Sequence, residues 1–186
     1  MAHIILASSS PRRQELLQQL GLDFEIYRPD VDEAVHEGET VEHYVERLAR
    51  EKAQVVLNKY TDAIVIAADT SLSFAGQIIG KPESKQHAFS IWSMLSGQWH
   101  DVYSGICVAS SAQILSRVVR TQVELQQLSH AEMEKYWATG EPIGKAGAYA
   151  IQGIAAQYIP QIRGSYSNVV GLPLHEIAQL LESVKA

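Results

Sequence analysis

The stretch Ile4-Ile5-Leu6-Ala7-Ser8-Ser9-Ser10-Pro11-Arg12-Arg13 decides how this chain begins to fold. Its first four residues form a short apolar run, which predicts a strand. Ser10 suits a helix N-cap and Pro11 suits the first helical position, so a helix should follow and end before Gly21. The stretch therefore predicts a strand, a tight turn and a helix.

The charges of Arg12 and Arg13 are unusual for this position. A helix N-terminus already carries partial positive charge and free N–H groups, so each solvated arginine there costs about 0.3–1 kcal/mol. An anion bound between the arginines and the amides removes this conflict, and proteins hold phosphate in this way. Two solvated arginines on a surface turn remain the alternative, because arginine is a good helix former.

Length, charge and cysteine content limit the classes of function. The 186 residues suffice for one domain with a sizeable core or for two small lobes. A net charge of −6 argues against nucleic-acid binding, although a few local cations suffice for a small anion. The single cysteine, Cys107, excludes an intrachain disulfide and a cysteine-rich metal site. With no basic leader and no apolar run of membrane-spanning length, we expect a cytoplasmic protein with no membrane partner.

Hydrophobic periodicity places the remaining elements. Helices are predicted over 40–57, 84–95, 129–140 and from Pro173 onward. Strands are predicted over 64–68, 100–109, 114–125 and near Tyr158, with an ordered loop over 25–39. The two long strands are joined by a short turn and must pair antiparallel, while helices and strands alternate elsewhere. We therefore expect an α/β fold in which helices flank a mixed sheet.

Lys52 occupies an inward position of the predicted helix 40–57, in a stripe that is otherwise apolar. Lysine is seldom buried without a partner. Two interpretations stay open. The ammonium either reaches water past the core, or it lines a cleft and faces an anion.

Asp69 follows the predicted strand 64–68 and precedes Thr70. In α/β sheets ligands gather at the carboxyl ends of strands, so a carboxylate there is well placed for chemistry. A turn or helix-cap aspartate would give the same pattern. Lys81, held extended by the proline after it, adds a cation but is more typical of a solvated turn.

Gln152 and Glu33 complete the candidates. Gln152 lies in the small-residue segment 144–153, where the backbone permits close approach of a ligand; its amide suits either a base edge or nearby backbone. Glu33 belongs to an acidic stretch that is either solvated or, beside Asp69, a site for a divalent ion. The seven histidines show no zinc-site spacing.

Taken in order, these motifs resemble the Maf family of nucleoside triphosphate pyrophosphatases over nearly the whole chain. The matching blocks are Ser8-Ser9-Ser10-Pro11-Arg12-Arg13, Leu48-Ala49-Arg50-Glu51-Lys52-Ala53, Ala68-Asp69-Thr70, Gly80-Lys81-Pro82, Lys145-Ala146-Gly147-Ala148-Tyr149-Ala150-Ile151-Gln152-Gly153 and Val170-Gly171-Leu172-Pro173-Leu174. The block around Gln152 resembles the branch acting on dTTP and UTP. One departure is Gly144, where relatives often carry a polar residue.

The resemblance implies a fold and a set of roles. It implies one Maf/ITPase-like domain over 1–186, with an elongated mixed sheet, a central cleft and a homodimer as the assembly. Asp69 matches the proton acceptor. The positions matched to substrate binding and specificity are Ser8, Arg12, Arg13, Lys52, Thr70, Lys81 and Gln152. Glu33 matches an acidic position near the metal, which Asp69 is expected to share, with Mg²⁺ or Mn²⁺ as the cation.

The expected reaction is attack of water at the α-phosphorus of dTTP or UTP, releasing the nucleoside monophosphate and pyrophosphate. Removal of non-standard pyrimidine nucleotides would use the same chemistry. Nearby cations would keep Asp69 ionised, so it is expected to orient water or hold metal more than to remove a proton. A flipped Gln152 amide would equally serve cytosine. The alternative function is a regulator of cell division or septum formation that acts by binding a partner.

Overall fold

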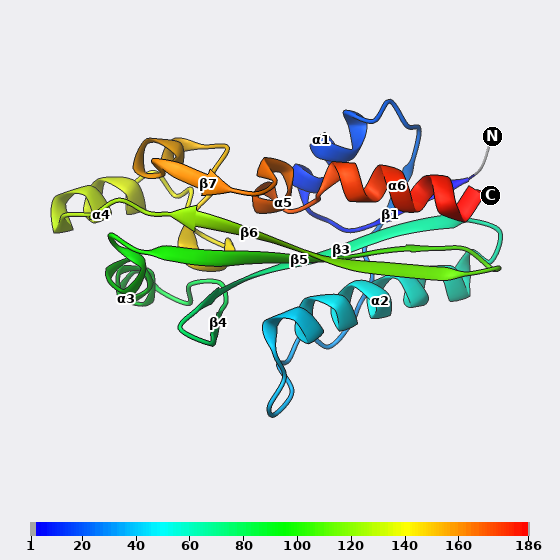
Figure 1. The fold of residues 1–186 in the computed structure, drawn as a ribbon, viewed down its shortest axis with the longest axis horizontal. Coiled ribbons are helices and arrows are strands. Elements are labelled where there is room, and N and C mark those ends of the chain that lie inside the picture. Colours follow the sequence, from blue (N-terminus) through cyan, green and yellow to red (C-terminus); the bar gives the residue numbers. More distant parts are fainter. Residues whose placement is uncertain (1–2, 186) are drawn as a thin grey trace.

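The computed structural model describes residues 3–185 and consists of a mixed sheet between helices (Figure 1). The strands are β1 (Ile4–Ala7), β2 (Glu25–Tyr27), β3 (Ile64–Phe74), β4 (Gln77–Ile79), β5 (Trp99–Ala109), β6 (Ile114–Glu124) and β7 (Gln161–Arg163). The helices are α1 (Pro11–Gln18), α2 (Val41–Lys59), α3 (Lys85–Leu95), α4 (His130–Trp137), α5 (Tyr166–Val170) and α6 (Leu174–Lys185), with 3₁₀ turns η1 (Ala146–Ala148) and η2 (Ile154–Tyr158). The predicted α/β class is confirmed.

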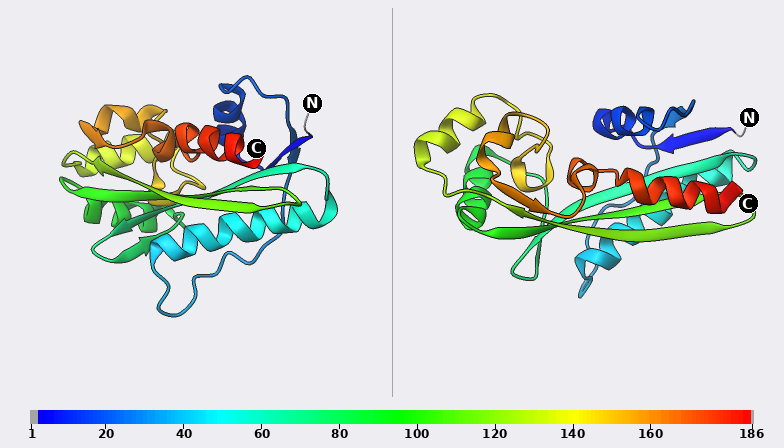
Figure 2. Two further views of the ribbon diagram at one scale, coloured as in Figure 1. Left: turned by 45° about the vertical axis from the view of Figure 1, so that its right-hand side comes forward. Right: turned by 45° about the horizontal axis from the view of Figure 1, so that its top comes forward.

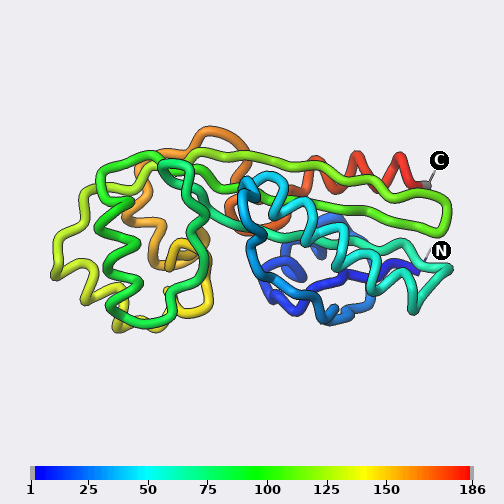
Figure 3. The backbone as a smooth tube through the Cα atoms, turned by 90° about the horizontal axis from the view of Figure 1, so that it is seen from below, coloured from blue at the N-terminus to red at the C-terminus, as the bar shows by residue number. Residues whose placement is uncertain are grey.

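The sheet has seven strands in the order β2-β1-β3-β5-β6-β7, and β4 pairs with the end of β3. Strand β1 pairs parallel with β2 and β3, whereas the other pairs are antiparallel. Strands β3, β5 and β6 have 11 residues each and run along the long axis of the molecule (Figures 1 and 2). They connect an end that holds α1, α2 and α6 to an end that holds α3, α4 and β7 (Figure 3).

Alternation along the strands divides the core between the two faces of the sheet. Ile5, Val65 and Cys107 belong to the cluster under α2, whereas Leu6 and Ile66 belong to the cluster that includes residues of α1 and α6. Helix α2 lies very close to β5 at Gly105. A Cβ atom there would collide with the carbonyl oxygen of Val45, so only glycine permits this approach.

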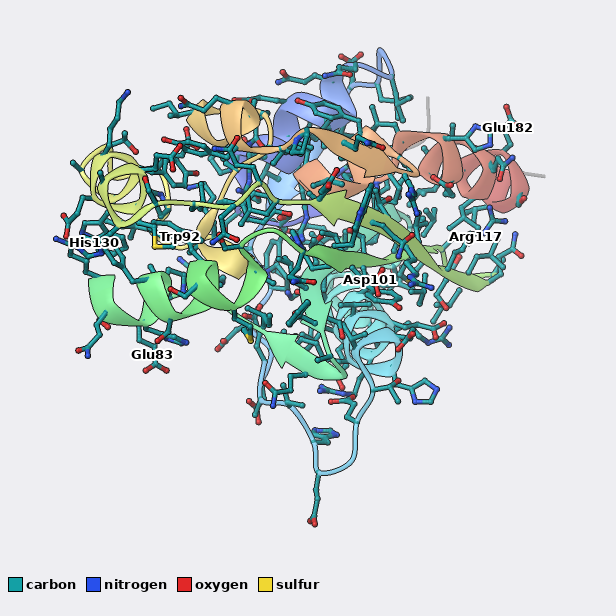
Figure 4. All side chains as sticks on the ribbon, turned by 60° about the vertical axis from the view of Figure 1, so that its left-hand side comes forward. Glu83, Trp92, Asp101, Arg117, His130 and Glu182 are labelled. Carbon is teal, nitrogen blue, oxygen red and sulfur yellow. The ribbon has the colours of Figure 1, made fainter. Side chains whose placement is uncertain are left out.

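Helix capping follows the sequence closely. The Thr40 hydroxyl accepts from the backbone N–H of His43, and Ser129 forms the predicted capping box with Glu132. Ser10 occupies the predicted N-cap of α1 but makes no side-chain cap bond. At the far end of the molecule Trp92 of α3 (Figure 4) packs against Tyr136 of α4. Its Nε1 donates to the Ala148 carbonyl oxygen at 3.0 Å.

Three local predictions are wrong. The loop predicted over 25–39 contains the edge strand β2, and the strand predicted near Tyr158 is the 3₁₀ turn η2, with β7 following it. The strand predicted to stop before Asp69 continues to Phe74. Among residues 3–185, the structure has no helix long and apolar enough to cross a membrane.

Candidate active site

Strand β3 is longer than the two strands that pair with one of its edges, β1 and β4, and part of that edge is therefore left open. Strand β1 ends opposite Ala67, and β4 begins to pair only at Leu72, so neither strand covers this edge of β3 between these two residues. Asp69 and Thr70 lie in the uncovered segment. Because successive strand residues point to opposite faces, Asp69 faces α2 and Thr70 faces α1 and α5. The two side chains therefore border the same opening from opposite faces of the sheet.

A cleft of about 1430 Å³ lies at this opening. Its walls come from the turn between β1 and α1, the middle of β3, the loops near 28–33 and 80–81, and the segment 141–153. All nine residues predicted for the site line it: Ser8, Arg12, Arg13, Glu33, Lys52, Asp69, Thr70, Lys81 and Gln152. The structure has the central cleft that the family resemblance implies, although Asp69 reaches it from mid-strand rather than from a strand end.

Lys52 lies between two carboxylates at the α2 side of the cleft. Its Nζ is 2.7 Å from Oδ1 of Asp69 and 2.7 Å from Oε1 of Glu33. The Lys52 and Asp69 side chains are only 9% and 12% exposed, whereas Glu33 is half exposed. Burial raises the pKa of Glu33, but the hydrogen bond and charge of Lys52, with Lys81 and Arg13, lower it overall. The buried lysine thus faces anions, as one of its two interpretations predicted.

Arg13 of α1 lies on the side of the cleft opposite α2, where it is hydrogen-bonded to β3 and to the end of α5. Its Nε donates to the carbonyl oxygen of Gly171 at 2.8 Å, and Nη2 donates to Oγ1 of Thr70 at 3.1 Å. Thr70 also hydrogen-bonds the fully buried Ser104 at 2.8 Å. Burial lowers the pKa of Arg13 and outweighs the opposing effect of Asp69. A desolvated guanidinium gains most from a further anion in the cleft.

Arg12 and Lys145 add two cations that are less constrained. Burial lowers the pKa of Arg12, and burial followed by the charge of Arg12 lowers the pKa of Lys145. Lys81 is exposed on the loop after β4. The cleft therefore offers positive charge from α1, from the residue before η1 and from that loop, around a carboxylate pair. This arrangement suits a polyphosphate with a bound cation.

Comparison with known proteins decides the family. The family model described as "Maf-like protein" matches residues 3–184. The chain belongs to the Maf family. A curated protein from Acinetobacter baylyi named dTTP/UTP pyrophosphatase is 71% identical and aligns over 97% of this chain and 99% of its own length. Proteins of that name from Colwellia psychrerythraea and Myxococcus xanthus are 49% and 48% identical, over 96% of this chain and 86% and 91% of their own lengths.

A solved structure, that of the Staphylococcus aureus Ham1 protein, matches this Maf chain with a TM-score of 0.45 and 16% sequence identity. The match covers 67% of this chain and 71% of the Ham1 chain.

The carboxylates of this Maf protein are suited to a divalent cation that arrives with substrate. Asp69 and Glu33 each direct one oxygen, Oδ1 and Oε1, to Nζ of Lys52, so a divalent cation would be held by the second oxygen of each carboxylate. In residues 3–185 no group of three or more His, Cys, Asp and Glu side chains forms a ready metal site. Hard cations such as Mg²⁺ commonly combine one or two carboxylates with substrate phosphates, and this donor set fits that pattern.

Three residues that line the cleft of this Maf protein are not among the site residues predicted from the sequence: Tyr44, Glu141 and Lys145. Tyr44 donates through its hydroxyl to the Glu33 carbonyl oxygen at 2.9 Å and so holds the loop that carries Glu33. Burial, followed by Asp69 and Glu33, raises the pKa of Tyr44 to about 12. Lys145 belongs to the motif 145–153, and helical periodicity places Tyr44 on the same inward stripe as Lys52, but no sequence signal indicates where Glu141 points.

Proposed function

We propose that this Maf-family protein hydrolyses dTTP and UTP to the nucleoside monophosphate and pyrophosphate. The observation that carries the proposal is the convergence of Arg12, Arg13, Lys52 and Lys81 on the cleft that holds Asp69 and Glu33. The curated relatives share the activity in their names at 48–71% identity over nearly the whole chain. An acidic protein that concentrates cations in one cleft is suited to a small polyanion.

The triphosphate is placed against Arg12, Arg13 and Lys81, with its α-phosphorus near Asp69. A water hydrogen-bonded to Asp69 attacks the α-phosphorus, and the bond from that phosphorus to the bridging oxygen breaks. Pyrophosphate leaves with the bridging oxygen, and its charge is balanced by the cations. Asp69 orients the water and accepts its proton directly or through solvent. Positioning and charge stabilisation supply most of the rate.

A divalent cation, Mg²⁺ or Mn²⁺, would be held by Asp69 and Glu33 and would supply charge neutralisation at the phosphate oxygens. Lys52 then keeps the two carboxylates together through its ion pairs on both. Lys52 also contributes a fixed positive charge beside the α-phosphate of the bound triphosphate. The role of Lys52 is thus to organise the anionic side of the site.

Base choice is assigned to Gln152, with Thr70 and Arg12 as further specificity positions. The carbonyl oxygen of the Gln152 amide can accept from N3–H of uracil or thymine while its NH₂ donates to a ring carbonyl. Substituted or otherwise non-standard pyrimidines that keep this edge would be accepted as well. Rejection of cytosine requires the amide to be held in one orientation, because the flipped amide matches cytosine.

A nucleotide panel with product identification tests the proposal. We expect hydrolysis of dTTP and UTP to exceed that of CTP, ATP and GTP by about 10²-fold or more in kcat/KM, since a mismatched polar edge leaves groups unpaired. The products are expected to be the monophosphate and pyrophosphate. Comparable turnover of GTP, or release of single orthophosphates, would contradict the assignment.

We further infer that residues 1–186 act as one catalytic domain with two lobes about the cleft, in the cytoplasm and as a homodimer. These inferences are supported by the family resemblance. A role as a partner-binding regulator of cell division is not favoured, because the curated relatives are named as enzymes. Nucleic acid is not a proposed partner, given the net charge of −6.

A further inference from the structure

The segment that carries Gln152 is held by a carboxylate that has no part in the proposed chemistry. Glu141 lies just after α4, and its Oε2 accepts from the backbone N–H of Ile154 at 2.8 Å. Its Oε1 accepts from the backbone N–H of Ala155 at 3.1 Å. These two N–H groups open the turn η2 immediately after Gln152 and Gly153. One side chain thus fixes the backbone on the C-terminal side of Gln152.

Tyr136 fixes the backbone on the other side. Its hydroxyl donates to Oε1 of Glu141 at 2.6 Å and accepts from the backbone N–H of Ala150 at 3.2 Å. The Tyr136 ring is buried and packs at 5.3 Å from Trp92 and 5.8 Å from Tyr158, measured between ring centroids. The pair Tyr136–Glu141, called here the clamp, is therefore anchored in the core of the α3–α4 end.

Gly153 shows how closely the clamp approaches the segment. A Cβ atom at this position would collide with the carboxylate of Glu141, so a larger residue would push the clamp away. In residues 3–185 the Gln152 side chain is exposed and makes no hydrogen bond. The side chain can rotate about its own torsions, so the clamp fixes only the backbone position from which the Gln152 amide extends into the cleft.

The protonation states of Glu141 and Tyr136 determine which group donates and which accepts in each hydrogen bond of the clamp. Burial raises the pKa of Glu141, but the hydrogen bonds from Tyr136, Ile154 and Ala155 outweigh it and hold that pKa below its usual range. Burial, followed by the bond to Glu141, raises the pKa of Tyr136. At neutral pH the carboxylate only accepts and the phenol keeps its proton. Charge-assisted bonds of this kind are stronger than neutral ones.

We propose that Tyr136 and Glu141 are positioning residues for base selectivity, which they confer by fixing the backbone from Ala150 to Ala155 and hence the point from which the Gln152 amide reaches the base. The predicted effect on base selectivity rests on the proposed function. The predicted restraint of the backbone rests on the hydrogen-bond geometry alone. A base edge is read reliably only when the reading amide cannot turn to suit a competitor. The clamp contributes by holding the backbone on both sides of Gln152, which limits the positions from which the amide can approach a base.

The test uses Glu141→Gln, which keeps the side-chain size but replaces one acceptor oxygen by a donor facing a backbone N–H. The matched control is Glu134→Gln, which removes an exposed carboxylate of α4 that pairs with Lys85. We expect Glu141→Gln to lower the ratio of kcat/KM for dTTP over CTP by about tenfold, corresponding to the loss of one well-fixed polar contact. Glu134→Gln should leave the ratio unchanged.

A double-variant cycle separates positioning from general structural damage. Gln152→Ala alone should lower the selectivity ratio, and adding Glu141→Gln to it should change the ratio by less than about twofold. Amide hydrogen exchange without nucleotide gives a readout that does not need activity, and the Ile154 and Ala155 amides should exchange about tenfold faster in Glu141→Gln.

Unchanged selectivity in Glu141→Gln, a full additional loss in the double variant, or unchanged exchange at Ile154 and Ala155 would each overturn the inference. A wild-type enzyme that does not hydrolyse dTTP or UTP contradicts the proposed function instead. In that case the exchange rates still decide whether the clamp holds the segment.

Discussion

Replacing Asp69 by asparagine is expected to lower kcat for dTTP hydrolysis by about 10³-fold or more, in line with loss of a general base together with its charge. The amide cannot accept a proton and is a poor ligand for a hard cation. It can still accept the hydrogen bond from Lys52, which in the wild type spans 2.7 Å to Asp69. Lys52 also keeps its bond to Glu33. The fold should therefore survive while turnover is lost.

The matched control for this variant is Asp101→Asn. Asp101 lies on β5 (Figure 4) and pairs with Arg120 through bonds of 2.8 and 3.0 Å. It is not among the residues that line the cleft. It loses the same charge and should retain wild-type turnover. Steady-state kinetics and thermal unfolding of both variants check the prediction. Turnover retained by Asp69→Asn would remove Asp69 from its assigned role.

Replacing Lys52 by methionine is expected to affect both activity and stability. Asp69 and Glu33 would lose the ammonium that both contact at 2.7 Å. Removing one partner of a buried pair costs about 3–5 kcal/mol, and we expect about 3 kcal/mol here because Glu33 is half exposed. The kcat/KM should fall by about 10²-fold or more, as for loss of one preorganised charge. Lys85→Met removes an exposed lysine that pairs with Glu134 and should change neither quantity measurably.

The stability loss of Lys52→Met should depend on pH with a defined sign. Lys52 helps to hold the folded-state pKa of Glu33 below its ordinary value. A depressed carboxyl pKa stabilises the fold above the unfolded pKa, which is about 4.3 for glutamate, and that contribution disappears as pH falls through the folded value. Urea unfolding at pH 7 and at pH 3 should therefore show a larger difference between variant and wild type at pH 7. An equal difference at both pH values would show that the Glu33 pair contributes nothing to it.

Short-range signals predicted much of the fold because they depend on neighbouring residues. The Ser129 capping box and the alternation of buried and more exposed residues over 119–125 each specify local geometry, and the structure confirms both. The inward position of Lys52 likewise follows from helical periodicity. These features need no knowledge of the strands that lie beside them.

The errors arise where long-range pairing decides the structure. Strand β3 runs past Asp69 because β5 pairs with it from Val65 to Ser73, and no local signal reports the length of a partner strand. The short strands β2 and β4 are held only by single neighbours. The clamp between Tyr136 and Glu141 depends on a phenol and a carboxylate that meet across the end of α4. The resemblance located the cleft residues, but it did not indicate what supports them.

Hydrolysis of dTTP in ¹⁸O-labelled water tests the central claim most directly. If Asp69 directs water to the α-phosphorus, the label must appear in dTMP, and the pyrophosphate must remain unlabelled. Mass spectrometry of the separated products after a single turnover gives the answer without assumptions about rate. Label in pyrophosphate would place the attack at the β-phosphorus and contradict the account.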